Sequence, residues 1–548
     1  MSKIKIFALG GLNENGKNMY VVDVDNDLFI FDAGLKYASD KMLGVDYIIP
    51  DFKFLSDNIK RIKGIFLTHG HEKYMGAVCD IVRNIPDINV YATKFTCDLL
   101  KRDFIDSDIK FDNLHLITAH KKITFGKNSV FPVSLTHSVP DTVGYVLNTE
   151  DGAIMYTGNF VFDSSMTGAY KTDIGKLAYI GKQGVLCLLS ESEYAQKTGY
   201  TAPYNRVAND VRDVLLHNDG RVIVTLFTNH ISRLQELFTE VSKTHRKIVV
   251  MGKKLQNIVN YVIDEGYVTF DKSRIGNLTN IEDRDSVILI SNENERPFMN
   301  LERIVNGYDK YVKINENDTI FYLEPVQVGM EKISAKLSDD ISKLGANVVM
   351  LSSSNHLLNH ASSEDLMLML NLMNPKYYFP VIGEYRHMLE NANIASSIGI
   401  SKENIILKLN GEAAIFENGN LTEEKEMIPV NELLIDGNST TDIGELVLKD
   451  RELLSENGIV IICATLDKKT KEILAGPEVL TRGFIYVKES TQIIEKMKEI
   501  SLGVINSNIS NNYVEFNKIK NGIREELGKY LYAETECKPM IITVVTEI

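Results

Sequence analysis

Short apolar runs separated by polar turns dominate the first 205 residues. Runs rich in Val, Ile, Phe and Tyr predict strands at 3–9, 19–25, 27–34, 62–68, 89–94, 130–138, 143–149, 152–158 and 184–192. An amphipathic helix is predicted just after residue 71, where Met75, Val78, Cys79 and Val82 share one face. Mixed strands with helices packed outside them indicate a layered α/β sandwich.

The pattern changes between residues 206 and 361. Apolar strands are predicted at 221–227, 247–253, 286–292, 318–325 and 346–351, and they alternate with helical segments such as 231–241 and 255–266. Such alternation favours a parallel sheet, because two parallel strands need a crossover connection. We therefore expect a second α/β domain in this segment.

The chain is then predicted to return to the first domain over residues 362–440, with a helix at 363–374 and a strand at 377–383. Residues 441–455, which overlap a polar stretch, are expected to form a linker. A helix at 491–506 and strands at 458–467, 484–489 and 540–548 predict a small α/β domain over residues 456–548.

Composition agrees with several globular domains. At 548 residues the chain is too long for one core, and its 44% hydrophobic and 24% charged residues are ordinary. The N-terminal stretch lacks a signal peptide and no apolar run is long enough to span a bilayer, so we expect a cytoplasmic protein with no membrane association. Five scattered cysteines indicate neither a disulfide framework nor a thiolate zinc site.

The net charge of −14 argues against a nonspecific nucleic-acid coat, because phosphate neutralisation needs clustered Lys and Arg. Any nucleic-acid binding must then be confined to a groove. Basic clusters at 60–63, 243–247 and 253–254 are candidates for its lining, although short clusters of this kind are more often solvated surface.

The clearest chemical signal is the stretch FLTHGHEKYMGA at residues 66–77. A strand runs directly into His69 and His71, and side chains at the end of a strand can converge on one point. Lys73 and Tyr74 follow, and neither an ammonium nor a neutral phenol is a suitable ligand for Zn²⁺ or Mn²⁺. From these residues alone, a metal site and a pair of ordinary core histidines both stay open.

THGHEKYMGA resembles the HxHxDH signature of metallo-β-lactamase-fold hydrolases with its last two ligands replaced. Together with stretches at 9–52, 137–145, 158–163, 355–388 and 475–490, it resembles the bacterial ribonuclease J family, most closely the poorly active second paralogue that some bacteria carry. The resemblance implies an α/β fold with three parts: an αββα metallo-β-lactamase sandwich at 1–205 and 362–440, an inserted β-CASP domain at 206–361, and a C-terminal dimerisation domain at 456–548.

The same resemblance assigns His69, His71 and His137 to the first of two metal sites in the family. Three imidazoles with an open fourth position can hold one divalent ion, Zn²⁺ or Mn²⁺, and activate a water. Whether this chain binds that ion or retains only a vestige of the site stays open.

The second metal site differs at four ligand positions. Lys73, Tyr74, Asn159 and Ile382 stand where the family has Asp, His, Asp and His. Without the bridging carboxylate, two dications would repel each other, so we expect no second ion. We expect the Lys73 ammonium in its place, where it could neutralise an RNA phosphate but could not make hydroxide from water.

The loop at 356–360 matches the family's HxSGHAS motif with both histidines retained. The resemblance implies RNA contacts for His356, Leu357, Leu358, Asn359 and His360, and it makes His360 the candidate proton donor. Asn359 replaces a glycine and is expected to keep a left-handed turn. An ordinary Ser/Asn-rich helix cap would explain the serines but not both histidines.

Two further matches are weaker. Arg233 follows a predicted strand at a helix start; it is an RNA-binding candidate, but we expect it to be one of several arginines on the helix surface. The segment 191–195, ESEYA, stands where the family has DSTNA.

Three functions compete. A small-molecule metallo-hydrolase would not need the inserted and C-terminal domains. A fully active metal-dependent 5′-to-3′ exo- or endoribonuclease would need the lost ligands. We therefore favour an RNA-binding ribonuclease J homologue with weak residual 5′-to-3′ exonuclease activity at most, from one ion or from metal-free acid–base chemistry at His360.

The resemblance also implies partners. These are RNA and an active ribonuclease J paralogue, in mRNA decay and rRNA maturation, within a homodimer, heterodimer or tetramer and an RNA degradosome.

Overall fold

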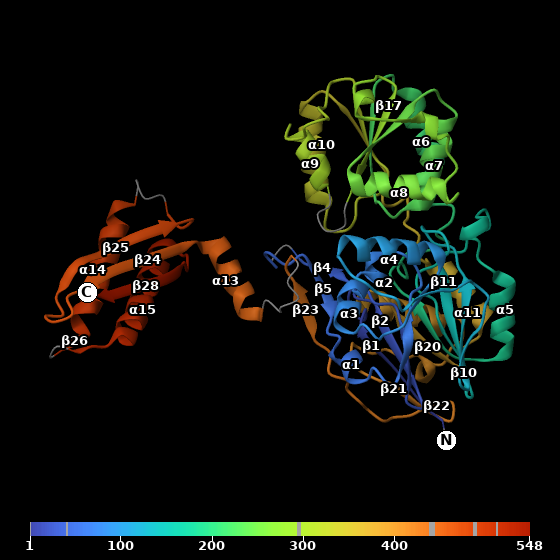
Figure 1. Ribbon diagram of the computed structural model, residues 1–548, viewed down its shortest axis with the longest axis horizontal. Coiled ribbons are helices and arrows are strands. Elements are labelled where there is room, and N and C mark those ends of the chain that lie inside the picture. The colour runs from blue at the N-terminus through green and yellow to red at the C-terminus, as the bar shows by residue number, and fades with distance from the viewer. Residues whose placement is uncertain (1, 40–41, 293–297, 438–443, 486–489, 511–512) are drawn as a thin grey trace. The chain divides into compact units, whose positions relative to one another are not determined.

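The computed structural model describes residues 2–39, 42–292, 298–437, 444–485, 490–510 and 513–548 (Figure 1). It divides into two compact units, one of residues 1–37 and 47–433 and the other of residues 38–46 and 434–548. Among the helices described, none has the length and apolar character needed to cross a bilayer.

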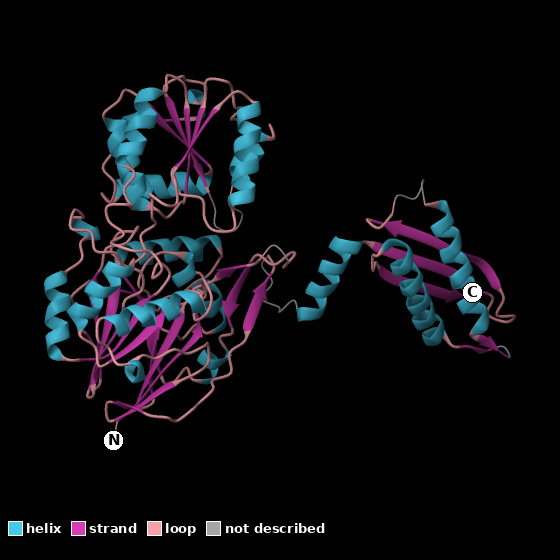
Figure 2. Ribbon diagram, turned by 180° about the vertical axis from the view of Figure 1, so that it is seen from behind, coloured by secondary structure: helices cyan, strands magenta, loops and turns pink. Residues whose placement is uncertain are grey.

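Two mixed sheets form the body of the first unit (Figure 2). The eight-stranded sheet has the order β22 (Asn420–Leu421), β21 (Ala414–Glu417), β1 (Lys3–Gly10), β2 (Met19–Val24), β3 (Asp27–Phe31), β6 (Ile62–Phe66), β7 (Val90–Ala92), β8 (Leu114–Leu116). The six-stranded sheet has the order β20 (Tyr377–Val381), β13 (Val185–Glu191), β12 (Gly152–Tyr156), β11 (Val143–Thr149), β10 (Asn128–Ser134), β9 (Ile123–Phe125). The short strands β4 (Lys36–Tyr37) and β5 (Tyr47–Pro50) pair antiparallel beside them.

Aromatic rings fill the layer between these sheets. Phe31 and Phe66 of the first sheet contact Tyr145 of the second, with ring centres 5.8 and 5.7 Å apart. All three side chains are at most 1% exposed. Alternate residues of each strand point into this layer, so the apolar runs in the sequence become its core. The expected αββα sandwich is confirmed.

Helices cover the outside of the sandwich. They are α1 (Lys53–Asp57), α2 (Glu72–Met75), α3 (Val78–Asn84), α4 (Lys94–Asp106), η1 (Gly168–Tyr170), α5 (Ile174–Gln183), α11 (Ser363–Met373), α12 (Tyr385–Ser397) and η4 (Lys402–Asn404). The single helix expected after residue 71 is two short ones. The helix is interrupted because the Ala77 N–H does not donate to the Lys73 carbonyl within the helix. The Ala77 N–H donates to the Ala33 carbonyl, and the Lys73 carbonyl accepts from the Asn18 N–H.

Residues 206–361, where the inserted domain is predicted, contain a six-stranded sheet of their own. Its order is β16 (Ile275–Gly276), β15 (Lys247–Met251), β17 (Ser286–Ser291), β14 (Val222–Leu226), β18 (Thr319–Tyr322), β19 (Asn347–Met350), and every neighbouring pair is parallel, as predicted. The helices of this segment are α6 (Ala208–His217), α7 (Ile231–Ser242), α8 (Lys253–Asp264), η2 (Lys272–Arg274), η3 (Leu278–Asn280), α9 (Met299–Val305) and α10 (Glu331–Lys343). In Figure 1, α9 and α10 lie on one face of the sheet, and α6 and α7 on the other.

The second unit is a small α/β domain. Its sheet has the order β25 (Ile473–Arg482), β24 (Ile459–Leu466), β28 (Met540–Glu547), and α14 (Thr491–Ser507) and α15 (Phe516–Thr535) share a buried core with it. Two short strands, β26 (Ile509–Ser510) and β27 (Tyr513–Val514), pair with each other, and β23 (Glu432–Ile435) precedes the unit's helices in the chain.

Two expectations for this unit need comment. Most of the expected linker at 441–455 is helical, because α13 (Gly444–Asn457) occupies it; residues 441–443 lie outside the described residues. The strand expected at 484–489 also falls largely on undescribed residues, 486–489, and its first two residues are not in a strand.

The sandwich brings the ends of distant strands to one edge. The Asp32 N–H after β3 donates to the Phe66 carbonyl of β6, and the Thr157 N–H after β12 donates to the Leu189 carbonyl of β13. The Ser192 N–H after β13 donates to the Ile382 carbonyl after β20. Loops that carry the candidate site residues therefore lie side by side at this edge.

Candidate metal centre and RNA-binding pocket

Three imidazoles meet where these loops converge. His69 and His71 follow β6 and His137 follows β10, and their ligand nitrogens lie within 4.8 Å of one another. Their ring centres are 4.7, 4.8 and 4.9 Å apart. Imidazoles around one tetrahedral ion, with nitrogens about 2 Å from it, have ring centres about 5 Å apart. The three side chains therefore fit one ion.

Hydrogen bonds fix which nitrogens of His69 and His137 are available to that ion. His137 Nδ1 lies 2.7 Å from the Asn359 carbonyl oxygen, which can only accept, so Nδ1 carries the proton and Nε2 keeps its lone pair. His69 Nδ1 lies 2.8 Å from Thr68 Oγ1, whose hydroxyl also contacts the Asp32 carboxylate. His69 Nε2 is buried and has no hydrogen-bond partner among the described residues. Metal-binding histidines are commonly oriented in this way.

The electrostatic surroundings keep these rings neutral. Burial lowers the pKa of His69 and His137 well below 6.5, and the neighbouring histidines lower both further. Burial, followed by His230 and His360, lowers the pKa of His71 to about 3. Neutral imidazole is the form that binds a metal ion, so the three rings are held ready as ligands.

The four residues predicted to stand at the second metal position offer different chemistry. Tyr74 packs its ring 4.2 Å from that of His69, and burial raises its phenol pKa far above 10, so the phenol stays neutral. Lys73 Nζ lies 4.0 Å from Glu193 Oε1. Asn159 donates its amide N–H to Glu191, and its Oδ1 is buried without a partner among the described residues. Of these side chains, Asn159 and Tyr74 each present an unpaired oxygen among the described residues, but both groups are neutral, and a neutral phenol is a poor metal ligand.

Ile382 is the fourth of these positions, and its backbone is unusual. Its φ is +58°, a left-handed conformation that β-branched residues rarely adopt, and its side chain is 2% exposed. The conformation is held because the Ile382 N–H donates to Tyr20 Oη at 3.1 Å and its carbonyl accepts from the Ser192 N–H at 3.0 Å. An apolar side chain thus fills this position in a constrained loop, and it offers no metal ligand.

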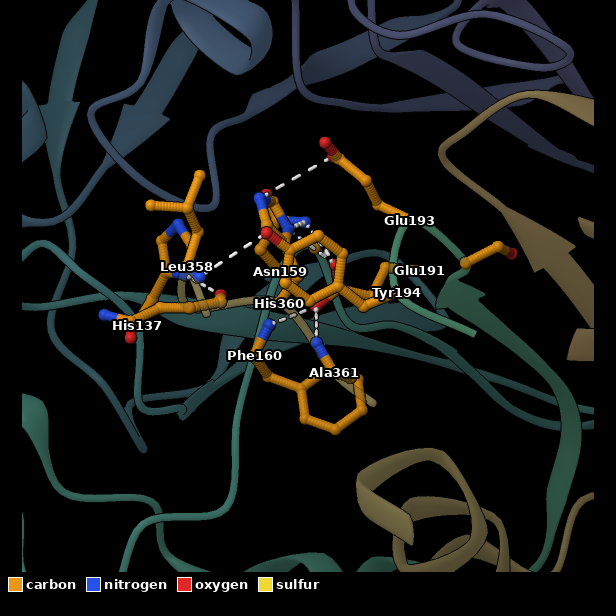
Figure 3. A network of polar contacts seen from close by, with 12 residues as sticks. His137, Asn159, Phe160, Glu191, Glu193, Tyr194, Leu358, His360 and Ala361 are labelled. Carbon is orange, nitrogen blue, oxygen red and sulfur yellow. Dashed lines mark hydrogen bonds and ion pairs between the residues drawn. The ribbon is translucent and has the colours of Figure 1, made fainter. Parts of the chain in front are cut away.

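The three histidines form the first half of the centre, and the acids Glu191 and Glu193 with Lys73, Asn159 and His360 form the second half. Glu191 holds the second half together (Figure 3). Its carboxylate is 0% exposed and accepts hydrogen bonds from the Phe160 N–H (2.7 Å), the Ala361 N–H (3.2 Å) and Asn159 Nδ2 (2.7 Å), and it contacts His360 Nδ1 (3.0 Å). Four partners satisfy this buried charge, so Glu191 ties the loop after β12 to the loop that carries His360.

Glu193 supplies a second carboxylate on the pocket side. His360 Nε2 lies 3.7 Å from its Oε2, so His360 stands between two acids (Figure 3). Burial alone would raise the pKa of Glu193, but His360 and then Lys73 outweigh it and hold that pKa at about 2. Burial would lower the pKa of His360, and the two acids reverse this and raise it above 6.5. Only the ESEYA match pointed to these acids in the sequence; its signal is two carboxylates at i and i+2, at the end of a buried strand and just beyond it.

The expected RNA-binding loop borders the same centre. His356 Nε2 lies 3.1 Å from Asp210 Oδ2, and Asn359 accepts a hydrogen bond from Asn205 Nδ2 at 2.9 Å. Leu357 is 7% exposed and its N–H donates to the Tyr204 carbonyl. The left-handed turn expected at Asn359 is wrong, because φ at this residue is not positive. The contacts of His356 with Asp210, Leu357 with Tyr204 and Asn359 with Asn205 hold the loop instead.

Arg233 is not a surface residue. It is 1% exposed; its guanidinium donates to Glu324 Oε2 and to the carbonyls of Leu323 (2.9 Å) and Leu357 (2.7 Å). The expected surface position is wrong, because α7 presses this side chain against the end of β18 and the loop. Arg233 therefore anchors Leu357, and its buried guanidinium disfavours direct contact with RNA.

A pocket of about 640 Å³ opens over the centre. It lies between the sandwich edge and the inserted domain, and it is lined by His71, His137, Asn159, His356, Leu358, Asn359 and His360, among others. Its wall carries both signs of charge: four cations, Lys73, Lys197, Lys254 and Arg386, and four glutamates, Glu72, Glu193, Glu331 and Glu384. Of the basic clusters noted in the sequence, only Lys254 reaches this wall.

The sandwich, the inserted parallel-sheet domain and the histidine centre define a metallo-β-lactamase-fold protein of the β-CASP type. Family models agree: residues 29–174 match the beta-lactamase superfamily domain, residues 219–338 the ribonuclease J beta-CASP domain, and residues 446–548 the ribonuclease J C-terminal domain. The chain belongs to the ribonuclease J family, whose members are RNA-processing hydrolases.

Within that family the chain resembles the J2 proteins. It is 36% identical to "Ribonuclease J2" of Bacillus subtilis (strain 168), with 100% of this chain and 99% of that one aligned. It is 36% identical to "Ribonuclease J 2" of Staphylococcus epidermidis RP62A and 34% to that of Staphylococcus aureus MRSA252, over 100% of this chain and 98% of each relative. A crystal structure of a protein of unknown function from Enterococcus faecalis V583 shares the fold, at TM-score 0.54 and 14% identity, over 76% of this chain and 100% of that one.

Proposed function

We propose that this chain is an RNA-binding ribonuclease J2-like protein that holds at most one divalent ion, Zn²⁺ or Mn²⁺, and no second ion. Its 5′-to-3′ exoribonuclease activity is weak and residual at most. The observation that carries the proposal is the Lys73–Glu193–His360 array, in which two cations flank one partly buried carboxylate beside Asn159. Charges that already compensate one another leave little attraction for a further dication.

Electrostatics explains why this arrangement costs activity. Metal-dependent hydrolysis of a phosphodiester needs a metal-bound hydroxide, and it needs a cation that stabilises the leaving oxygen. A lysine ammonium can neutralise a phosphate oxygen, but it cannot lower the pKa of water as a metal ion does. Lys73 therefore supports RNA binding and replaces only part of what a second ion would provide.

The remaining groups have defined tasks in this proposal. A single ion held by His69, His71 and His137 would lower the pKa of a bound water. His360, held at Nδ1 by Glu191 and facing Glu193 through Nε2, carries a proton at a position suited to a leaving oxygen. His356, Leu358 and Asn359 line the wall along which the RNA backbone would lie.

We further propose that the chain works mainly as a cytoplasmic partner of an active ribonuclease J paralogue, in mRNA decay and rRNA maturation. Similarity to proteins named Ribonuclease J2 and the C-terminal domain at residues 446–548 support this role. Homodimers, heterodimers or tetramers, and membership of an RNA degradosome, are the assemblies to be tested. Co-purification of the two chains and mass measurement in solution distinguish them.

The test of activity uses the full chain, purified free of any paralogue, on 5′-monophosphorylated RNA with Mn²⁺, Mg²⁺ or EDTA. We expect RNA binding with turnover far below that of an active family member assayed alongside. Turnover at the same rate would reject the proposal in favour of a fully active exo- or endoribonuclease.

A restored variant, K73D/Y74H/N159D/I382H, sharpens that result. It returns the family's ligand types to all four positions, so it should bind a second ion and gain activity. If it binds no second ion, the assignment of these positions is mistaken.

A further inference from the structure

A fourth histidine faces the metal centre from the inserted domain. His230 lies between β14 and α7, is 6% exposed, and lines the pocket together with His71 and His137. Its Nδ1 is 2.8 and 3.0 Å from the two oxygens of Glu324. The carboxylate accepts, so Nδ1 carries the proton and the lone pair is on Nε2. No described residue forms a hydrogen bond with that Nε2.

The position of His230 suits a ligand. Its ring centre is 6.5 Å from that of His71, whereas the other three rings are 4.7 to 4.9 Å apart. Rings that share a tetrahedral ion lie about 5 Å apart, so the His230 ring must move by at least about 1.5 Å toward His71 to join the three-histidine set. Its carboxylate partner is also one of the groups that commonly orient metal-bound histidine.

We propose that His230 is a fourth imidazole ligand of the single ion, supplied by the inserted domain to the His69–His71–His137 set. The inference rests on the proposed single-ion centre and deepens it. A structural role explains the Glu324 contact, since Glu324 also pairs with Arg233 in the interior. A structural role does not explain why His230, whose Nε2 has no hydrogen bond to a described residue, lies beside the three-histidine set.

Two consequences follow from four imidazoles. An all-nitrogen, tetrahedral set selects Zn²⁺ over Mn²⁺, which prefers oxygen ligands. It is also closed: with no position for water, the ion fixes the inserted domain on the sandwich and produces no hydroxide. The ion would then stabilise the RNA-binding form of the protein, and the weak residual hydrolysis would come from acid–base chemistry at His360 and not from a water on the ion.

The test needs no activity measurement. X-ray absorption of the zinc-loaded full chain should show four imidazoles, and the optical spectrum of the Co²⁺-loaded chain should not respond to azide, because no exchangeable position is open. In His230→Asn the fourth position becomes open. The Co²⁺ spectrum should then respond to azide, and zinc affinity measured by chelator competition should fall about tenfold or more.

Two controls separate ligation from folding. His356→Asn removes another pocket histidine with a carboxylate partner, Asp210, and should leave zinc affinity and the azide test unchanged. Glu324→Gln keeps the His230 ring but weakens its orientation, so it should lower zinc affinity about tenfold. If His230→Asn does not fold, the wild-type spectra and Glu324→Gln still decide the question.

Three results would overturn the inference: an azide-sensitive wild-type Co²⁺ spectrum, three imidazoles by X-ray absorption, or no retained zinc. Each would leave the proposed weak ribonuclease standing. Two ions per chain would instead overturn the proposed function itself.

Discussion

The two halves of the centre differ in their electrostatics: the first consists of neutral ligands and the second of paired charges. In the first half, His69, His71 and His137 are neutral and keep lone pairs free, and acceptors behind them hold their other nitrogens. In the second half, Glu191 and Glu193 are matched by amide, imidazole and ammonium groups. An ion binds where ligands have free lone pairs. Charged groups that already have partners attract an ion only weakly, so substitutions in the two halves should have different effects.

Removing Glu191 should produce the largest loss of stability. Glu191→Ala leaves two buried backbone N–H groups, the Asn159 amide and His360 without their acceptor. We expect the free energy of unfolding to fall by about 3–5 kcal/mol in chemical denaturation. Glu384→Ala removes a half-exposed pocket acid paired with Arg386 and should cost less than about 1 kcal/mol. Equal losses for the two variants would contradict the role given to Glu191.

The folding stability should depend on pH through Asp32, which lies behind the three histidines. Burial raises the pKa of Asp32 to about 7 against hydrogen bonds from Thr68 and Tyr156. The folded state then holds this proton more tightly than the unfolded state, so stability falls as pH rises from about 4 through 7. Asp32→Asn should remove about 2 kcal/mol of that change between about pH 5 and 7, measured by urea unfolding. Identical pH slopes in both proteins would refute this.

Lys73 should weaken ion binding at the first half from across the centre. In Lys73→Met, we expect zinc to bind about three- to tenfold more tightly, because a nearby positive charge is gone. The pKa of Glu193 should rise from about 2, since one of its two cations is lost. Lys254→Met, which changes another pocket lysine near Glu72, is the matched control and should have a smaller effect. A larger increase in zinc affinity in Lys254→Met than in Lys73→Met would contradict the role given to Lys73.

The loop that joins the halves should give the smallest effect. Asn359→Gly removes a hydrogen bond with Asn205, but the backbone carbonyl that holds His137 remains. We expect a stability loss of about 1 kcal/mol and little change in zinc affinity. Asn205→Ala should cost a similar amount, and the double variant should cost less than the sum. Strict additivity would show that this contact carries no energy.

The fold could be predicted because its signals are local. Period-two and helical apolar patterns mark the strands of the sandwich and the alternating segments of the inserted domain, and the parallel sheet follows from their order. The break between α2 and α3 was missed because its cause, hydrogen bonds to residues 18 and 33, lies in another part of the chain.

The site could be predicted only where spacing or motif carries it. His69, His71 and His137 were found in this way. His230 was missed because its signal is Glu324, 94 residues away. Arg233 was placed on the surface because nothing near it in sequence shows the distant groups that bury it. Tertiary contacts of this kind leave no periodicity to detect.

The most direct test of the central claim is the number of ions per chain. The full chain, loaded with excess Zn²⁺ or Mn²⁺ and then freed of unbound metal, should contain at most one ion by elemental analysis. The same sample should degrade 5′-monophosphorylated RNA far more slowly than an active family member. Two ions per chain with rapid degradation would contradict the account.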